Sequence, residues 1–284
     1  MSLIFRRLGL GGGAIKGILH VGALLELSKY QPLHFPDGVY GISVGAIIAT
    51  YLAFGLPFDE KASELLTKHM DKNVFLREFR MEMLATCFTS KGLYPMTHFE
   101  NNLIEMFESR GLDIRNKVLG DAKMPLYIVA SNLTKGIPTI FSKNVPVLEA
   151  LKCSCCIPIV FQPRILYDQI YVDGDLFCPS IDSIMPLDDS TLCLSLKKHM
   201  YDSEFTPKKL KSITPLKYIY DLHTASVQRY HDKIKTDKTC VLWYPGLRSY
   251  SNIHDISIID IFGKAATDLN SFLSAKGIHK ELPK

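Results

Sequence analysis

The chain has 284 residues, of which 47% are hydrophobic and 22% charged, and its formal net charge is +4. This composition is that of a globular protein and argues against disorder. The mild excess of basic residues includes no long basic run, which argues against nucleic acid as a partner. Seven cysteines are an odd number and suggest no disulfide framework, so we expect a reducing compartment.

The sequence has no targeting or membrane-spanning signal. The apolar run in residues 1–8 is too short for a signal peptide, and no stretch reaches the length of a transmembrane helix. We therefore expect a cytoplasmic protein. If it acts on lipid, it associates transiently with the membrane surface.

The first fifty residues predict a repeated strand–helix unit. A strand over Leu3–Leu10 leads through a glycine-rich loop to a helix over Ile15–Tyr30. A second strand at Val39 and Tyr40 runs into an apolar helix over Val44–Ala53. This order is typical of a parallel sheet covered by helices, so the fold class is α/β.

The rest of the chain continues in the same style, without an internal repeat or a linker. We expect a single domain over residues 1–284, with a C-terminal part from about 197 that completes the fold with helices. The apolar side of the last helix should pack on the core, with a membrane-binding face as the alternative. The predicted helices cover 57–73, 75–89, 97–109, 147–155, 213–233 and 256–275, and the predicted strands cover 126–130, 139–141, 165–172, 192–196 and 240–244.

Ser43 stands in the sequence Gly41-Ile42-Ser43-Val44-Gly45, between the second strand and its helix. The G-x-S-x-G pattern in this context is that of a nucleophile elbow. Two glycines allow the arms of a sharp turn to pass close to one another, and the helix N-terminus favours developing negative charge. An N-cap serine is the simpler explanation, so the pattern alone leaves both open.

The glycine-rich loop Gly11-Gly12-Gly13-Ala14-Ile15-Lys16-Gly17 also lies between a strand and a helix. Such a loop presents backbone N–H groups to an anion. A dinucleotide site would need an acidic residue at the end of the second strand, and a P-loop would need serine or threonine after Lys16. Neither is present, whereas an oxyanion hole needs no further residue and explains a nearby serine.

Two further segments stand out downstream. Tyr171-Val172-Asp173-Gly174-Asp175 places an aspartate at the end of a strand, which on its own indicates a surface turn. Ser154-Cys155-Cys156-Ile157-Pro158 is a small-residue helix end stopped by proline. Its cysteines lack a second ligand pair at a zinc-like spacing, so we expect no metal and no cofactor.

Taken in order, these segments resemble the patatin-like phospholipase family over about residues 3–196. The resemblance includes the loop from Gly12 to Gly17, the elbow around Ser43, the segment ending at Pro158 and the Asp173-Gly174 turn, and Lys91-Gly92-Leu93-Tyr94 is similar as well. Two positions depart from the family pattern. Ala14 stands where the family usually has glycine, which disfavours a positive φ, and Asp175 stands where glycine or alanine is common. Asp175 is expected either to raise the pKa of Asp173 or to point into solvent.

The resemblance implies a three-layer α/β/α sandwich with a mostly parallel central sheet, and a lipid acyl hydrolase that forms an acyl-serine. It implies Ser43 as the nucleophile and Asp173 as the base, with the backbone N–H groups of Gly12, Gly13 and Ala14 as the oxyanion hole. Lys16 is a candidate contact for an anionic headgroup, or a surface lysine. Lipid at a membrane surface is the expected partner, and the sequence identifies no protein activator.

Two alternatives remain at this point. A Ser–His–Asp hydrolase would draw its histidine from His199, His223, His231 or His254, none of which lies in a distinctive motif. A non-catalytic lipid-binding scaffold with the same fold would be indicated by the loss of Ser43 or Asp173, and both are present.

Overall fold

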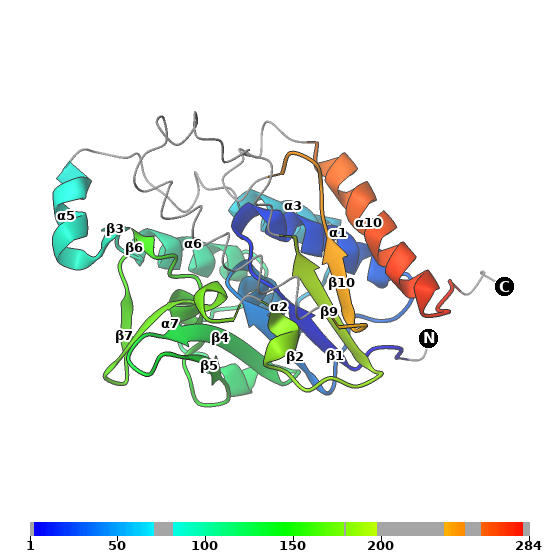
Figure 1. The fold of residues 1–284 in the computed structure, drawn as a ribbon, viewed down its shortest axis with the longest axis horizontal. Helices are drawn as coiled ribbons and strands as arrows, with labels where there is room; N and C mark the ends of the chain where they lie inside the picture. The colour runs from blue at the N-terminus through cyan, green and yellow to red at the C-terminus, as the bar shows by residue number, and fades with distance from the viewer. Residues whose placement is uncertain (1–2, 71–81, 179, 198–235, 248–256, 281–284) are drawn as a thin grey trace, which may run out of the picture.

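The computed structural model describes residues 3–70, 82–178, 180–197, 236–247 and 257–280. Its centre is an eight-stranded sheet in the order β10-β9-β1-β2-β4-β8-β7, with β5 paired to β4 (Figure 1). A separate two-stranded sheet pairs β3 with β6. The predicted α/β fold, with a mostly parallel central sheet flanked by helices, is confirmed.

Five strands make up the parallel part of the sheet. These are β10 (Thr239–Leu242), β9 (Thr191–Leu196), β1 (Arg7–Leu10), β2 (Gly38–Ile42) and β4 (Leu126–Asn132). Every residue of β2 is buried, as expected for a parallel strand covered on both faces. In the register, Leu10 lies opposite both Gly41 and Leu194, so β1, β2 and β9 end at the same edge.

The other end of the sheet is antiparallel. There β4 pairs with β5 (Ile137–Phe141) and with β8 (Gln169–Asp173), and β8 pairs with β7 (Arg164–Leu166). The single strand predicted over 165–172 is therefore wrong, because the chain reverses within it. Tyr167 and Asp168 have φ of 51° and 56°, the backbone of a two-residue type I′ hairpin turn, which aspartate tolerates better than most residues.

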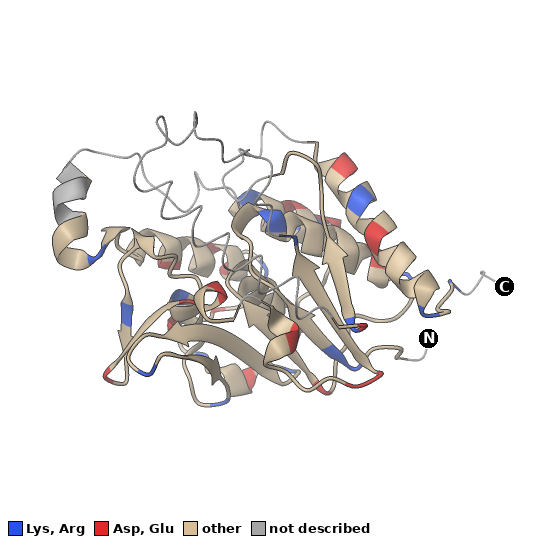
Figure 2. Cartoon of the chain, in the orientation of Figure 1, with Lys and Arg blue, Asp and Glu red and all other residues tan. Residues whose placement is uncertain are grey.

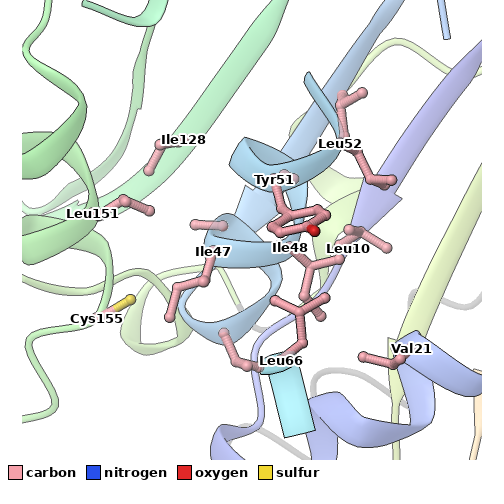
Figure 3. Packing of buried hydrophobic residues seen from close by; sticks show 14 of the residues in the cluster. Leu10, Val21, Ile47, Ile48, Tyr51, Leu52, Leu66, Ile128, Leu151 and Cys155 are labelled. Atoms are coloured by element: carbon pink, nitrogen blue, oxygen red, sulfur yellow. The ribbon is translucent and has the colours of Figure 1, made fainter. Parts of the chain in front are cut away.

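Helix α2 (Val44–Ala53) packs on β2 and β4 at the centre of the main core. Figure 3 shows its side chains between Leu10 of β1 and Leu151 of α7 (Val147–Ser154). All ten residues of α2 are buried, which explains its uncharged and mostly apolar sequence; the hydroxyl of Thr50 donates to the Ala46 carbonyl. A smaller cluster on the other face of the sheet includes Tyr40 and Ile42.

Helix α10 (Ile258–Ala275) packs along α1 (Ile18–Leu27), which a short 3-10 helix over Ala14–Gly17 precedes. The two helices approach closely at Gly22, where a Cβ atom would lie 2.9 Å from Phe262 Cα. The buried stripe of α10 consists of Ile261, Ala265, Leu269 and Leu273. Because α1 covers this stripe, the core-packing alternative for the last helix is the correct one. Figure 2 shows charged residues along α10 and near the ends of several strands.

Among the described residues, the other α-helices are α3 (Glu60–His69), α5 (Glu82–Ser90) and α6 (Thr97–Glu108). Strand β3 (Gly92–Tyr94), which is not among the predicted strands, lies between α5 and α6 and pairs with β6 (Ile159–Phe161). This pairing needs glycine, since a Cβ at Gly92 would collide with the Phe161 backbone. The predicted helix over 213–233 and the first part of the one over 75–89 lie outside the described residues. In the described part of the chain, no helix is both long and apolar enough to span a bilayer.

Candidate functional site

Ser43 occupies the turn between β2 and α2, as the elbow pattern predicts. Its backbone has φ 52° and ψ −124°, a conformation that is strained for any residue with a side chain. Both glycines of the pattern are required by close packing. A Cβ at Gly41 would lie 2.5 Å from Ala46 Cα, and one at Gly45 would collide with the carbonyl oxygen of Leu10.

Asp173 is the last residue of β8 and lies against Ser43. The Ser43 hydroxyl donates a hydrogen bond to Asp173 Oδ2 over 2.6 Å, although the residues are 130 positions apart. The other carboxylate oxygen, Oδ1, accepts from the Asp175 backbone N–H at 2.9 Å. Both side chains are nearly buried, at 6% and 5% exposure. The contact is direct, so a proton can pass from Ser43 to Asp173 without an intermediate group.

Ser154 hydrogen-bonds to the backbone of the turn at Ser43. The Ser43 backbone N–H donates to Ser154 Oγ at 2.9 Å, and the Ser154 hydroxyl donates to the Val129 carbonyl at 2.6 Å. The small-residue segment at the end of α7 therefore fixes the nucleophile's backbone to β4. The sequence pointed to this segment but gave no role to Ser154, because its partners are distant in the chain.

The glycine-rich loop lies beside both members of the pair. A Cβ at Gly45, two residues after Ser43, would meet the Gly11 carbonyl oxygen at 2.7 Å. A Cβ at Gly12 would meet the carboxylate of Asp175, two residues after Asp173, at 2.8 Å. The structure thus brings the loop, Ser43 and Asp173 together in one site. It also places the Asp175 side chain against Gly12 rather than out in solvent.

His20 supports the loop and was missed in the sequence. Its ring is fully buried in α1, and Nε2 donates to the Gly11 carbonyl at 2.9 Å. Burial lowers the pKa of His20 to about 4, so the ring is neutral at neutral pH. On the strand side, the Gly11 N–H donates to Leu194 O at 3.0 Å. Both the N–H and the C=O of Gly11 are therefore hydrogen-bonded.

Ala14 has a positive φ of 51°, the conformation that its side chain disfavours. The loop therefore keeps its form with alanine, at a cost of about 1 kcal/mol. Gly13, just before it, caps the 3-10 turn, and its carbonyl accepts from the Lys16 N–H at 3.2 Å.

The Lys16 side chain is buried, with 7% exposure. Its ammonium group donates to the Lys197 carbonyl at 3.1 Å, just after β9. In this arrangement Lys16 ties the start of the loop's helix to the end of a neighbouring strand. Its contact with an anionic headgroup stays a prediction.

The three clustered cysteines, Cys153, Cys155 and Cys156, are buried in the core. Burial raises the pKa of both Cys153 and Cys156 to about 12, so these thiols stay protonated at neutral pH. In the described part of the chain, no three potential metal-ligating side chains come together. The four histidines of the triad alternative, His199, His223, His231 and His254, lie outside the described residues.

The family model for patatin-like phospholipases matches residues 8–179, which is more than half of the chain. The chain belongs to the patatin-like phospholipase family. The matched range contains the elbow, the glycine-rich loop and Asp173, so the family predicted from the sequence is confirmed.

Individual relatives of this family are distant. A probable lipid hydrolase of invertebrate iridescent virus 6 is 28% identical over 61% of this chain and 60% of its own length. A cUMP-AMP-activated phospholipase of Escherichia coli is 25% identical over 67% of this chain and 60% of its own. The chain thus matches about 60% of the length of these relatives.

Among solved structures, ExoU in its heterodimeric complex with SpcU from the type III secretion system of Pseudomonas aeruginosa has a similar fold. The TM-score is 0.50 at 14% identity, over 96% of this chain and 52% of the other. This similarity supports the patatin fold for the family member described here.

Proposed function

We propose that this chain hydrolyses acyl esters of membrane lipids, with Ser43 as the nucleophile and Asp173 as the general base. The observation that supports this most directly is the 2.6 Å hydrogen bond between the two side chains at a strained strand–helix turn. Family membership supports the substrate class, and the geometry supports the proposed chemistry. The Ser–His–Asp alternative is not favoured by the family.

In the first half of the reaction, Ser43 Oγ attacks the carbonyl carbon of the ester as its proton passes to Asp173 Oδ2. The tetrahedral intermediate collapses as Asp173 returns that proton to the leaving alcohol, and the acyl group stays on Ser43. Water then repeats the sequence: Asp173 takes its proton, the fatty acid leaves, and Ser43 recovers its hydrogen. An aspartate has an ordinary pKa near 4, so its burial and direct contact with Ser43 are what make it an effective base.

The glycine-rich loop is the proposed oxyanion hole, with backbone N–H groups of Gly12, Gly13 and Ala14 as donors. The Ser43 N–H is bonded to Ser154 Oγ and is therefore not one of the proposed donors. In a trans peptide the C=O and N–H point in opposite directions. By holding the Gly11 carbonyl, His20 therefore directs the Gly12 N–H away from α1. His20 is a positioning residue in this proposal.

We expect His20→Leu to lower kcat about tenfold with little change in KM. The Gly12 N–H remains but loses its fixed direction, so the loss should be smaller than the 10²–10³ typical of deleting a donor. The leucine variant also leaves the Gly11 carbonyl without its donor, which should lower the free energy of unfolding by about 1–3 kcal/mol.

His20→Gln is the matched control for this position, because its side-chain amide donates from about the same place as Nε2. It should recover most of kcat. Steady-state kinetics and urea unfolding of the two variants separate positioning from stability. Equal kcat in the leucine and glutamine variants, at unequal stability, would contradict the positioning role.

The substrate test uses the purified chain with a mixed lipid extract, followed by mass spectrometry of the products. We expect free fatty acids together with lysolipids or deacylated glycerolipids, released in equal amounts, because hydrolysis of one ester gives one acid and one alcohol. Bound lipids recovered without any cleavage would indicate the scaffold alternative instead. The proposed place of action is a membrane surface reached transiently from the cytoplasm.

A further inference from the structure

The exposed hydrophobic side chains of this protein are unevenly placed. Nine large hydrophobic residues are exposed in the described part of the chain, and six of them lie on two neighbouring hairpins, β4–β5 and β7–β8. Isolated exposed hydrophobics are ordinary, but a contiguous group marks an interaction surface. The six are Leu133, Ile137, Ile140, Ile165, Tyr167 and Ile170.

The strand register places several of these side chains on one face of the sheet. Ile165 of β7 lies directly opposite Ile170 of β8. Leu133, just after β4, donates its N–H to the Ile170 carbonyl at 2.8 Å and so continues the row. Ile140 of β5 pairs with Val129, four residues before Leu133, and residues four apart in a strand share a face. We call Leu133, Ile140, Ile165 and Ile170 the hairpin face.

Exposed lysines stand on either side of β5 in the chain, close to the hairpin face. Residues 126–145, which contain the β4–β5 hairpin, include no aspartate or glutamate. Lys135 in the hairpin turn and Lys143 just after β5 are both exposed, and neither forms an ion pair within the described part of the chain. Asp168, in the turn between β7 and β8, is the only exposed acidic residue of the two described hairpins. An apolar surface with lysines close to it matches an anionic lipid surface, where each cation contributes about 1 kcal/mol.

Strand β8 connects this face to the site. Ile170 precedes Asp173 by three residues, a distance of about 10 Å along a strand. Three residues is an odd separation, so the side chains of Ile170 and Asp173 point to opposite faces of the sheet, and the hairpin face lies near the Ser43–Asp173 pair along β8 but on the other face. The other candidate surface, the apolar stripe of α10, is already packed on α1. Helix α10 lies at the other end of the sheet from β7 (Figure 1). Of its residues, only Ile259 is a large hydrophobic residue with an exposed side chain.

We propose that the hairpin face is the surface by which this protein binds an anionic phospholipid bilayer. The inference rests on the proposed function for its substrate class and extends it by naming the surface and the lipid charge. Isoleucine and leucine side chains enter the boundary between headgroups and acyl chains, and the two lysines contact the headgroups.

The test is co-sedimentation of the full chain with phosphatidylcholine vesicles, with and without phosphatidylserine. The wild type should bind more tightly when phosphatidylserine is present. Ile165→Ser combined with Ile170→Ser should weaken binding by about a hundredfold, about tenfold for each side chain removed from the lipid. Lys135→Gln combined with Lys143→Gln should remove about fivefold for each lysine, and only with phosphatidylserine.

Ile259→Ser on α10 is the matched control, because Ile259 is 84% exposed while Ile165 is 69% exposed. It should bind vesicles like the wild type. All variants should retain hydrolysis of a water-soluble acyl ester, since none removes a side chain of the Ser43–Asp173 pair or of the glycine-rich loop. A wild type that binds vesicles but cleaves no ester would contradict the proposed function and leave the hairpin face supported.

Three results would overturn the hairpin face. The first is vesicle binding by the hairpin double variant equal to that of the wild type. The second is equal loss in Ile259→Ser. The third, from sedimentation velocity, is a wild-type dimer that the hairpin double variant converts to a monomer, because a second copy would then be the occupant.

Discussion

Ser43→Ala should lower the hydrolysis of an acyl ester by more than about 10³-fold while the fold is retained. The substitution removes the only atom that can carry the acyl group in the proposed mechanism. It leaves the turn in place, because Gly41 and Gly45 still allow the two arms to approach. The measurement is the rate on one soluble acyl ester, with circular dichroism as the check on folding.

Ser43→Gly provides a matched control for the strain at this position. It should be as inactive as Ser43→Ala but more stable by about 1 kcal/mol, since both lack the hydroxyl and only glycine adopts φ 52°, ψ −124° without strain. Urea unfolding of the pair isolates this difference. Wild-type turnover by a folded Ser43→Ala protein would remove Ser43 from the mechanism.

Asp173→Asn should lower the same rate by about 10² or more, the range expected when a general base is lost. Asparagine preserves the shape of the side chain, and its oxygen can still accept from the Asp175 N–H. Its amide nitrogen, however, cannot take the Ser43 proton. The rate should therefore fall although the packing around the end of β8 is unchanged.

The histidine variants distinguish this pair from a triad. Single His199, His223, His231 and His254 to glutamine changes should each leave most of the activity, because no histidine carries the proton in a Ser–Asp mechanism. In a triad, loss of the histidine is about as damaging as loss of the serine. One folded glutamine variant as inactive as Ser43→Ala, or a normal rate in Asp173→Asn, would replace the proposed mechanism.

The parts of the fold that follow local rules were predictable from the sequence. The elbow could be located because steric demands confine it to five consecutive residues, Gly41 to Gly45. Helix α2 was predictable because a helix buried against a parallel sheet needs an uncharged, mostly apolar run. The β7–β8 hairpin was not, since its turn at Tyr167 and Asp168 contains neither glycine nor asparagine, the usual residues at positive φ.

The site required more than local rules. Asp173 alone indicates a surface turn, and only its order relative to the other family segments related it to Ser43. Ser154 and His20 had no such signal, because their roles depend on single hydrogen bonds to the backbone of distant residues. Alanine at position 14 was expected to disfavour a positive φ, yet the rest of the structure holds Ala14 in that conformation.

The two members of the Ser43–Asp173 pair are held with unequal firmness. Ser43 follows a strand that is paired on both sides, with β1 and β4. Asp173 ends a strand that pairs with β4 over three residues and otherwise with the three-residue edge strand β7. Sub-global opening of this edge costs less free energy than unfolding of the parallel core. We therefore expect catalytic competence and global stability to be governed by different cooperative units, and a bilayer resting on β7 and β8 would act on the weaker of the two.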